Sequence, residues 1–379
     1  MGSLFRFAVV LWLAALSAPA SAESLTAETR AMLKDLKFDE KILAGLDAEL
    51  KLPDGWLEAA KKEGAVSIYT TMSPKDWGKA EKVFRARYPD IKVDHSEVRT
   101  TTQRTLRPLL AFKEGRPLVD IITGLSGNSF LFGDAGAFVK LDSIPNYKNI
   151  PEELRVAGDI TAIFRVRFWC IGYNTDRIKK ADLPATWEDL VANPKAFGGR
   201  KLGLGNRPNN WLPNLWAVKG EEWGRKYIDD LFGKLDPQLR KEGLSALLAL
   251  VAAGEIDAVI PAAMDRVAQM QEKGAPVAHH CPDPVPMAVS ELGIMSNSPH
   301  LNAAKVMTNW LLSKEGQLAL FYANDATPAH KGLQGKEFIA FPDQIENKKK
   351  AIAEDRDGAE ENKLLEHWEA VAQKRAGGR

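Results

Sequence analysis

Residues 63–93 read EGAVSIYTTMSPKDWGKAEKVFRARYPDIKV, and this stretch decides the fold class. Apolar Val66 and Ile68 alternate with smaller or polar residues, which is typical of a strand. Ser73 then precedes Pro74, a favoured pair for the cap and first residue of a helix. The strand period resumes at the end of the stretch. The order strand, polar loop, capped helix and strand predicts a βαβ unit of an α/β protein.

The predicted helix begins directly after a strand. Its free N–H groups and the positive end of its dipole therefore face the space in front of the sheet. Such groups bind polar or anionic small molecules well. We expect a small-ligand site at this edge, with Ser73 contributing to it.

The alternation of strands and helices is interrupted by a second domain. Residues 65–162 follow the βαβ pattern, and residues 168–173 read as a strand that leaves the first domain. Residues 201–260 form further strands and helices, and residues 287–295 return to the first domain. A chain that leaves a domain and returns has the covalent basis of a hinge. We expect lobe 1 to comprise residues 23–165 and 286–379, and lobe 2 to comprise residues 166–285.

Several short motifs, taken in order, are similar to the bacterial extracellular solute-binding proteins of ABC importers, in particular the group that binds ferric iron, polyamines or aminoethylphosphonate. They are residues 63–93, VDIITGLSGNSFLFGDAGAFVKL from Val119, IGYNTDRI from Ile171, LPATWEDLVANPKAFGGRKLGL from Leu183, GEIDAVI from Gly254 and SPHLNAAKVMTNWLLSKEGQLALF from Ser298. The resemblance implies an α/β fold of the type II periplasmic binding class, with two lobes joined by hinge strands. It also implies a small-molecule solute and an inner-membrane ABC permease as partners, and no catalysis or cofactor. We expect a monomer.

The N-terminus has the form of a secretory signal. Arg6 precedes an apolar run at residues 7–16, and the small residues ASA (20–22) stand before Glu23. The apolar run is too short to cross a bilayer, which needs about 20 such residues. We expect cleavage after Ala22 and a periplasmic mature protein.

Composition fits this class of protein. The chain has 379 residues, of which 45% are hydrophobic, and this suits two globular domains. Lys and Arg residues number 51, against 50 Asp and Glu residues. Because the charge is balanced, we expect no nucleic-acid partner.

Cys170 and Cys281 are the two cysteines. An oxidising compartment permits a disulfide, and two separate buried thiols are the alternative. The family resemblance places both residues near the strands that cross between the domains, which favours the disulfide. Cys281 also follows His279 and His280, but neighbours on a strand point to opposite faces, so we expect no metal site.

The loop after the predicted strand 119–122 is the first candidate contact with the ligand. We expect Ser126, Asn128 and Ser129 to bind polar ligand atoms at the start of the next helix, and a plain helix cap is the alternative. The loop comes close to a nucleophile elbow, but Asn128 replaces the second glycine of that motif. A secreted serine hydrolase that uses Ser126 is therefore a weaker alternative.

A second candidate set follows the predicted strand 202–204. Open α/β sheets bind ligands at the carboxyl ends of their strands. A guanidinium there suits a carboxylate or phosphonate, amides orient the ligand, and an indole offers a flat wall. The residues are Asn206, Arg207, Asn210 and Trp211, and the alternative is a solvated loop with one buried tryptophan. We expect Arg207 to anchor the anionic part of the ligand from lobe 2.

Three further arginines stand near strand ends. Arg266 follows the predicted strand 256–260, and we expect it to contact the ligand. Arg165 and Arg167 alternate with apolar residues before the crossing strand. Their polar face borders either the cleft or solvent, and the sequence leaves both open.

The tyrosines argue against ferric iron. Iron-binding members of the similar family hold the ion chiefly with two adjacent tyrosines, whereas the six here are scattered at positions 69, 88, 147, 173, 227 and 322. Ferric iron remains an alternative within the same class. We expect an anionic or zwitterionic solute, such as a carboxylate, a phosphonate or an amino-acid-like compound.

Overall fold

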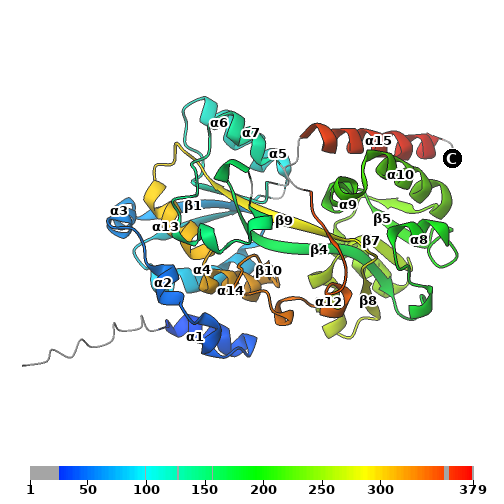
Figure 1. Cartoon of the computed structure of the whole chain (residues 1–379), viewed down its shortest axis with the longest axis horizontal. Coiled ribbons are helices and arrows are strands. Elements are labelled where there is room, and N and C mark those ends of the chain that lie inside the picture. Colours follow the sequence, from blue (N-terminus) through cyan, green and yellow to red (C-terminus); the bar gives the residue numbers. More distant parts are fainter. Residues whose placement is uncertain (1–24, 99, 126–127, 156, 354–357, 378–379) are drawn as a thin grey trace, which may run out of the picture.

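The computed structural model describes residues 25–98, 100–125, 128–155, 157–353 and 358–377. The chain forms two α/β lobes joined by long strands, with lobe 1 at the left and lobe 2 at the right of Figure 1. This confirms the predicted two-lobed α/β architecture with hinge strands. The predicted signal sequence, residues 1–22, lies outside the described residues.

A continuous sheet runs through both lobes in the order β2-β1-β3-β9-β4-β7-β5-β6. Each lobe has its own parallel strands, and the antiparallel pair β4 and β9 runs between them. The strands are β1 (Ala65–Thr70), β2 (Lys92–Glu97), β3 (Ile121–Thr123), β4 (Ala162–Asn174), β5 (Leu202–Gly205), β6 (Gln238–Arg240), β7 (Ala258–Ala263), β8 (Val277–His280), β9 (Val285–Ile294), β10 (Thr327–Pro328) and β11 (Lys350–Ala351).

Helices cover both faces of the sheet (Figure 1). Those of lobe 1 are α1 (Ala27–Leu36), α2 (Leu46–Leu50), α3 (Trp56–Glu63), α4 (Pro74–Arg87), α5 (Thr101–Arg104), α6 (Leu106–Lys113), α7 (Ser129–Asp134), α13 (Leu301–Leu311) and α14 (Lys314–Asn324). Those of lobe 2 are α8 (Trp187–Ala192), α9 (Leu212–Lys219), α10 (Glu221–Leu235), α11 (Leu244–Ala253), α12 (Met264–Glu272) and α15 (Gly358–Gly377). Short 3-10 turns are η1 (Glu40–Leu43), η2 (Pro145–Asn149), η3 (Glu152–Leu154), η4 (Ala157–Asp159), η5 (Lys180–Asp182), η6 (Pro208–Asn210), η7 (Lys336–Phe338) and η8 (Pro342–Gln344).

The opening unit β1-α4-β2 forms as its sequence predicts. The Ser73 hydroxyl accepts a hydrogen bond from the backbone N–H of Asp76 at 3.1 Å, and Pro74 is the first helical residue. Trp77 and Phe84 face the core of lobe 1 and are buried. The free N–H groups at the start of α4 therefore lie directly after β1, at the edge of lobe 1 that the sequence singled out.

Helix α13 begins at Leu301, three residues after Ser298. Ser298 donates its hydroxyl to the buried carboxylate of Asp120 at 2.6 Å, so it fixes the chain before the helix. The carboxylate of Glu63 accepts the N–H of Ala303 at 2.7 Å and caps the helix from α3. Because Glu63 is far from α13 in the sequence, no pattern near residue 301 predicts this helix cap.

A buried ion pair ties the helices of lobe 1 together. Glu315, at the start of α14, has no exposed surface and accepts two hydrogen bonds from the Arg87 guanidinium, each 2.8 Å long. Trp310 donates to the same carboxylate at 2.9 Å, and Thr29 donates at 2.6 Å. The carboxylate thus connects α1, α4, α13 and α14.

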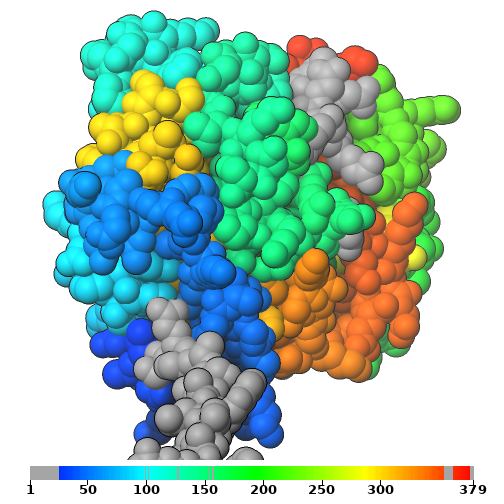
Figure 2. Space-filling view, turned by 60° about the vertical axis from the view of Figure 1, so that its left-hand side comes forward, coloured from blue at the N-terminus to red at the C-terminus, as the bar shows by residue number. Residues whose placement is uncertain are grey.

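The C-terminal segment makes a further crossing between the lobes. After α14, β10 pairs with β4, and β11 then pairs with β9 before the chain reaches α15. Figure 2 shows this segment as orange atoms along the right-hand side, below the red atoms of α15. We expected all of residues 286–379 in lobe 1, whereas α15 packs against α10 of lobe 2. The reason is Leu364 and Trp368, which are each 1% exposed in the core of lobe 2.

The structure joins Cys170 of β4 to Cys281, the residue after β8, in a disulfide whose Cα atoms are 4.9 Å apart. The bond links the crossing strand to the segment that leads into β9. We expect non-reducing peptide mapping of the purified protein to give one linked peptide pair. The denatured protein should have no titratable thiol, and two titratable thiols would exclude the bond.

Candidate ligand-binding cleft

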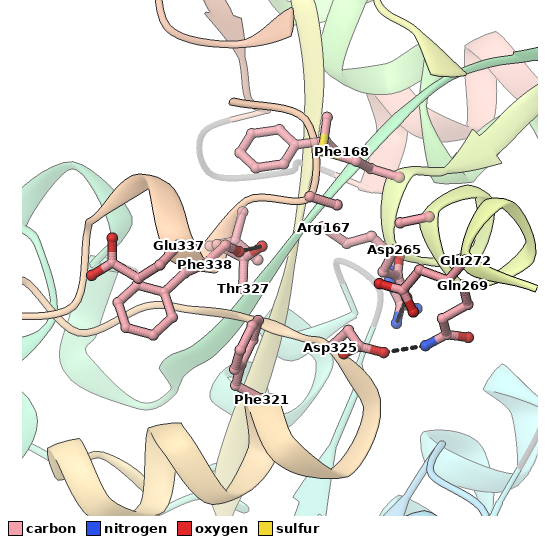
Figure 3. Close-up of a pocket in the computed structure, with 14 residues that line it drawn as sticks. Arg167, Phe168, Asp265, Gln269, Glu272, Phe321, Asp325, Thr327, Glu337 and Phe338 are labelled. Atoms are coloured by element: carbon pink, nitrogen blue, oxygen red, sulfur yellow. Dashed lines mark hydrogen bonds and ion pairs between the residues drawn. The ribbon is translucent and has the colours of Figure 1, made fainter. Parts of the chain in front are cut away.

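The crossing strand β4 has a free edge between the lobes. On that side β10 pairs with Arg165 and Val166, and β7 starts to pair at Trp169. Arg167 and Phe168 therefore have no neighbouring strand there. A cavity of about 180 Å³ opens at this gap, as Figure 3 shows, with α12 of lobe 2 on one side and the end of α14, β10 and η7 of lobe 1 on the other.

One face of β4 carries the charged groups of the gap. Arg165 and Arg167 alternate with Val166 and Phe168, whose side chains pack into the core of lobe 1. Arg167 lines the cavity, and its side chain is 26% exposed. Arg165 is only 7% exposed. The structure therefore places Arg167 at the cleft, whereas Arg165 is buried and does not line the cavity.

Arg165 is a buried cation held by neutral groups. It donates from Nη2 to the hydroxyl of Thr71, just after β1, at 2.7 Å. No ion pair among the described residues includes it. Burial first, and Arg167 second, lower the pKa of Arg165 to about 9, so the side chain stays charged at neutral pH. A buried charge without an opposite charge is costly, and a bound anion would remove that cost.

Other arginines surround Arg165. Arg104 of α5 is 4% exposed and donates to the carbonyl oxygens of Val98 and Gly124, each at 2.8 Å. Burial lowers the pKa of Arg104 as well. Because its partners are carbonyl groups, its positive charge is not neutralised by them.

Asp265 is the carboxylate nearest to this group. It pairs with Arg167 at 3.0 Å and lies 3.8 Å from Arg266 on α12. The charged groups that act on Arg165 are these three residues and Arg104. We call Arg104, Arg165, Arg167 and Arg266 the arginine cluster. Asp265 is the one carboxylate among the groups that act on Arg165, whereas the cavity itself is lined by Arg167 together with Asp265, Glu272, Asp325 and Glu337.

A hydrogen bond joins the lobes across the cavity. Gln269 of α12 donates its amide N–H to Asp325, the residue that caps the C-terminus of α14, as the dashed line in Figure 3 marks. Burial raises the pKa of Asp325, and Gln269 partly offsets this by hydrogen bonding. The two lobes are therefore already in polar contact on this side of the gap.

The lobe 1 residues predicted to bind ligand lie at strand ends. Ser73 is half-buried at the start of α4, where its hydroxyl serves as the helix cap. Asn128 donates its side-chain amide to the carbonyl oxygen of Leu125 at 2.9 Å, and Ser129 is buried as the first residue of α7. Ser126 lies outside the described residues.

The lobe 2 loop after β5 has a different environment from the one we expected. Trp211 has no exposed surface and packs on Trp187 with ring centroids 5.0 Å apart, so its indole belongs to the core of lobe 2 and forms no wall of the cavity. Asn206 accepts a hydrogen bond from Trp368 of α15 at 3.2 Å. The C-terminal helix thus packs on this loop, which sequence reading of the loop alone does not reveal.

Arg207 and Asn210 lie on the same loop, the first exposed and the second half-buried in η6. Neither lines the cavity of Figure 3, and Arg165 and Arg266 do not line it either. Arg266 does belong to the arginine cluster. The structure therefore brings Arg266 together with Arg165 and Arg167 and leaves the loop after β5 apart from them.

Arg104, Asp265 and Gln269 were not predicted as site residues. Arg104 lies on the four-residue helix α5, where no periodic pattern marks it. Asp265 lies in the first turn of α12. The available signal was the pair Arg165 and Arg167 inside an otherwise apolar strand.

Cys170, His279 and Cys281 converge, with potential ligand atoms within 4.8 Å of one another. His279 is buried, and burial lowers its pKa to about 3, so its ring is neutral. The two sulfur atoms are bonded to each other and are not thiolates. A metal would therefore find a single nitrogen ligand here while the disulfide is intact.

Two lobes hinged on crossing strands, with charged side chains meeting at the gap, define a bilobal solute-binding protein. Residues 67–318 match the family model "Bacterial extracellular solute-binding protein", and the chain belongs to this family. It is thus a solute-binding protein of the kind that serves ABC transporters. Among the described helices, none combines the length and apolar content that a membrane span needs.

Solved structures share the fold. Iron-bound HitA from Pseudomonas aeruginosa has 19% identity and a TM-score of 0.63, covering 81% of this chain and 99% of its own. AfuA from Actinobacillus pleuropneumoniae, with fructose-6-phosphate bound, has 20% identity and a TM-score of 0.62, covering 80% and 97%. An ABC transporter substrate-binding protein from Agrobacterium tumefaciens has 13% identity and a TM-score of 0.67, covering 82% and 96%. These similarities confirm the type II periplasmic binding fold. A comparison with curated protein sequences found no match.

Proposed function

We propose that this protein binds a small anionic or zwitterionic solute between its lobes and delivers it unchanged to an inner-membrane permease. The observation that carries the proposal is Arg165, a buried guanidinium with no carboxylate partner among the described residues. Arginine binds carboxylate and phosphonate through paired, charge-assisted hydrogen bonds. The protein acts as a monomer in the periplasm, after cleavage at Ala22, and performs no chemistry on the solute.

Closure follows from the same geometry. Arg165 and Arg104 belong to the lobe 1 side of the gap, whereas Arg266 belongs to α12 of lobe 2. A ligand anion that touches both sides binds the closed form better than the open form. That difference in affinity is what shifts the population of the hinge toward closure.

A thermal-shift screen tests the proposed function. We expect carboxylates or phosphonates to raise the unfolding temperature, because a ligand at about 100 times its dissociation constant adds ~2.7 kcal/mol of stability. Polyamines are the cationic probe in the same screen, because Asp265, Glu272, Asp325 and Glu337 also line the cavity. A shift with polyamines alone, or no shift with any anion, would contradict the proposal.

Ferric iron gives a separate prediction. HitA holds iron on a similar fold, but none of the six tyrosines of this chain lines the cavity. Loading with ferric citrate should therefore give no tyrosinate-to-iron absorption band. A visible band that disappears on Tyr→Phe substitution would show that iron is bound through tyrosine.

A further inference from the structure

Asn324, the last residue of α14, contacts the buried guanidinium from lobe 1. It is 6% exposed. With its amide oxygen turned toward Arg165, Asn324 accepts a hydrogen bond from Nη1 at 3.2 Å and donates its own N–H to the carbonyl oxygen of Leu320 at 3.2 Å. This orientation satisfies both ends of the amide, and the bond to Leu320 fixes which end faces Arg165.

Asn324 and Thr71 therefore hold the guanidinium from two directions. Thr71 accepts from Nη2 at 2.7 Å, and Asn324 accepts from Nη1 at 3.2 Å. Both acceptors are neutral. They orient the planar group and satisfy part of its hydrogen-bonding capacity, and neither of them neutralises its charge.

Elsewhere in the chain, carboxylates hold two other arginine side chains, one in the interior of lobe 1 and one at the cleft. The buried Arg87 is neutralised by Glu315 at 2.8 Å, and Arg167 is paired with Asp265 at 3.0 Å. Asparagine and aspartate have nearly the same shape, so an aspartate at 324 would fit the position and neutralise Arg165. Asn324 differs from such an aspartate in carrying no charge. The positive charge of Arg165 is therefore not neutralised by residue 324.

We infer that Asn324, supported by Thr71, is a positioning residue that determines specificity for anions by orienting Arg165 without neutralising it. The inference rests on the proposed function. It adds that Asn324 and Thr71 place no carboxylate on Arg165 that would compete with the anionic solute. A carboxylate introduced at either position would occupy the guanidinium in place of the solute.

The test compares charged with neutral substitutions at the two positions. The variants are Asn324→Asp and Thr71→Asp, with Asn324→Leu and Thr71→Val as matched neutral controls. Each full-length mature protein is titrated calorimetrically with inorganic phosphate and with methylphosphonate. Thermal unfolding of each ligand-free protein is measured in parallel.

We expect Asn324→Asp to weaken anion affinity by about thirtyfold or more, as losses at desolvated charge pairs do. We also expect its ligand-free unfolding temperature to rise, because a buried cation gains a partner. Asn324→Leu should lose a few-fold in affinity and should not gain stability. A residue with a merely structural role would lower stability and affinity together, so the opposite signs identify a positioning role.

The outcomes separate this inference from the proposed function. Wild-type protein that binds neither anion overturns the proposed function, and the inference falls with it. Wild-type protein that binds, with equal losses in the aspartate and neutral variants, overturns the inference alone. Thr71 is exposed, so Thr71→Asp gives the same comparison if Asn324→Asp does not fold.

Discussion

Replacing Arg165 by methionine is expected to weaken anion binding by about thirtyfold or more, since losing one partner of a desolvated charge pair costs ~2–5 kcal/mol. Methionine keeps most of the apolar length of the arginine side chain and removes the buried charge. The stability of the ligand-free protein should therefore hold or increase, because a buried cation without a counter-charge is itself unfavourable. Calorimetric titration with the strongest ligand of the screen, together with urea unfolding, measures both effects.

Arg85→Met is the matched control for this substitution. Arg85 lies on α4 with a side chain 60% exposed, and it pairs loosely with Glu81 at 3.9 Å. We expect no change in anion affinity. Arg207→Ala, measured beside it, tests the sequence-based expectation that the loop after β5 supplies the anchor. If Arg165→Met left the anion affinity unchanged and Arg207→Ala lowered it, the ligand would bind at the loop after β5.

The second large effect concerns stability rather than binding. Arg87→Met leaves the carboxylate of Glu315 in the core of lobe 1 without its cation. Removing one member of a buried pair is strongly destabilising, by about 3–5 kcal/mol, because the remaining charge is desolvated and uncompensated. Urea unfolding of the ligand-free protein should show this as a lower midpoint with a similar slope.

The loss of stability in Arg87→Met is compared with that in two further variants. Lys226→Met removes a surface pair with Asp230 in which the lysine side chain is 71% exposed, and it should cost less than about 1 kcal/mol. Arg87→Met combined with Glu315→Gln removes both charges and should recover part of the loss. If Arg87→Met were no more harmful than Lys226→Met, Glu315 would not depend on its partner.

Local patterns in the sequence predicted much of the fold. The cap at Ser73 and the order of strand and helix in β1-α4-β2 each depend on residues close together in the sequence, and the structure confirms them. The placement of α15 was wrong because Leu364 and Trp368 are apolar at helical spacing on a highly charged tail. Which lobe buries them depends on α10, and nothing in the tail itself identifies that partner.

The site was less predictable than the fold. The rule that ligands bind at the carboxyl ends of strands led to Ser73 and Arg266, and both lie at such ends. Whether Arg167 faces solvent or the cleft depends on how β10 and β7 leave one edge of β4 free. The surroundings of Trp211 depend likewise on Trp187 and Tyr227, which are distant in sequence. Tertiary contacts of this kind decide which polar residues meet.

A crystal structure of the mature protein with the strongest ligand of the screen is the most direct test of the account. We predict that the anionic group of the ligand lies within hydrogen-bond distance of the guanidinium of Arg165, on the arginine-bearing face of β4. Arg266 should approach it from α12, and Asn324 should remain bonded to Arg165. A ligand held by the loop from Asn206 to Trp211, with Arg165 making no contact to it, would contradict the account.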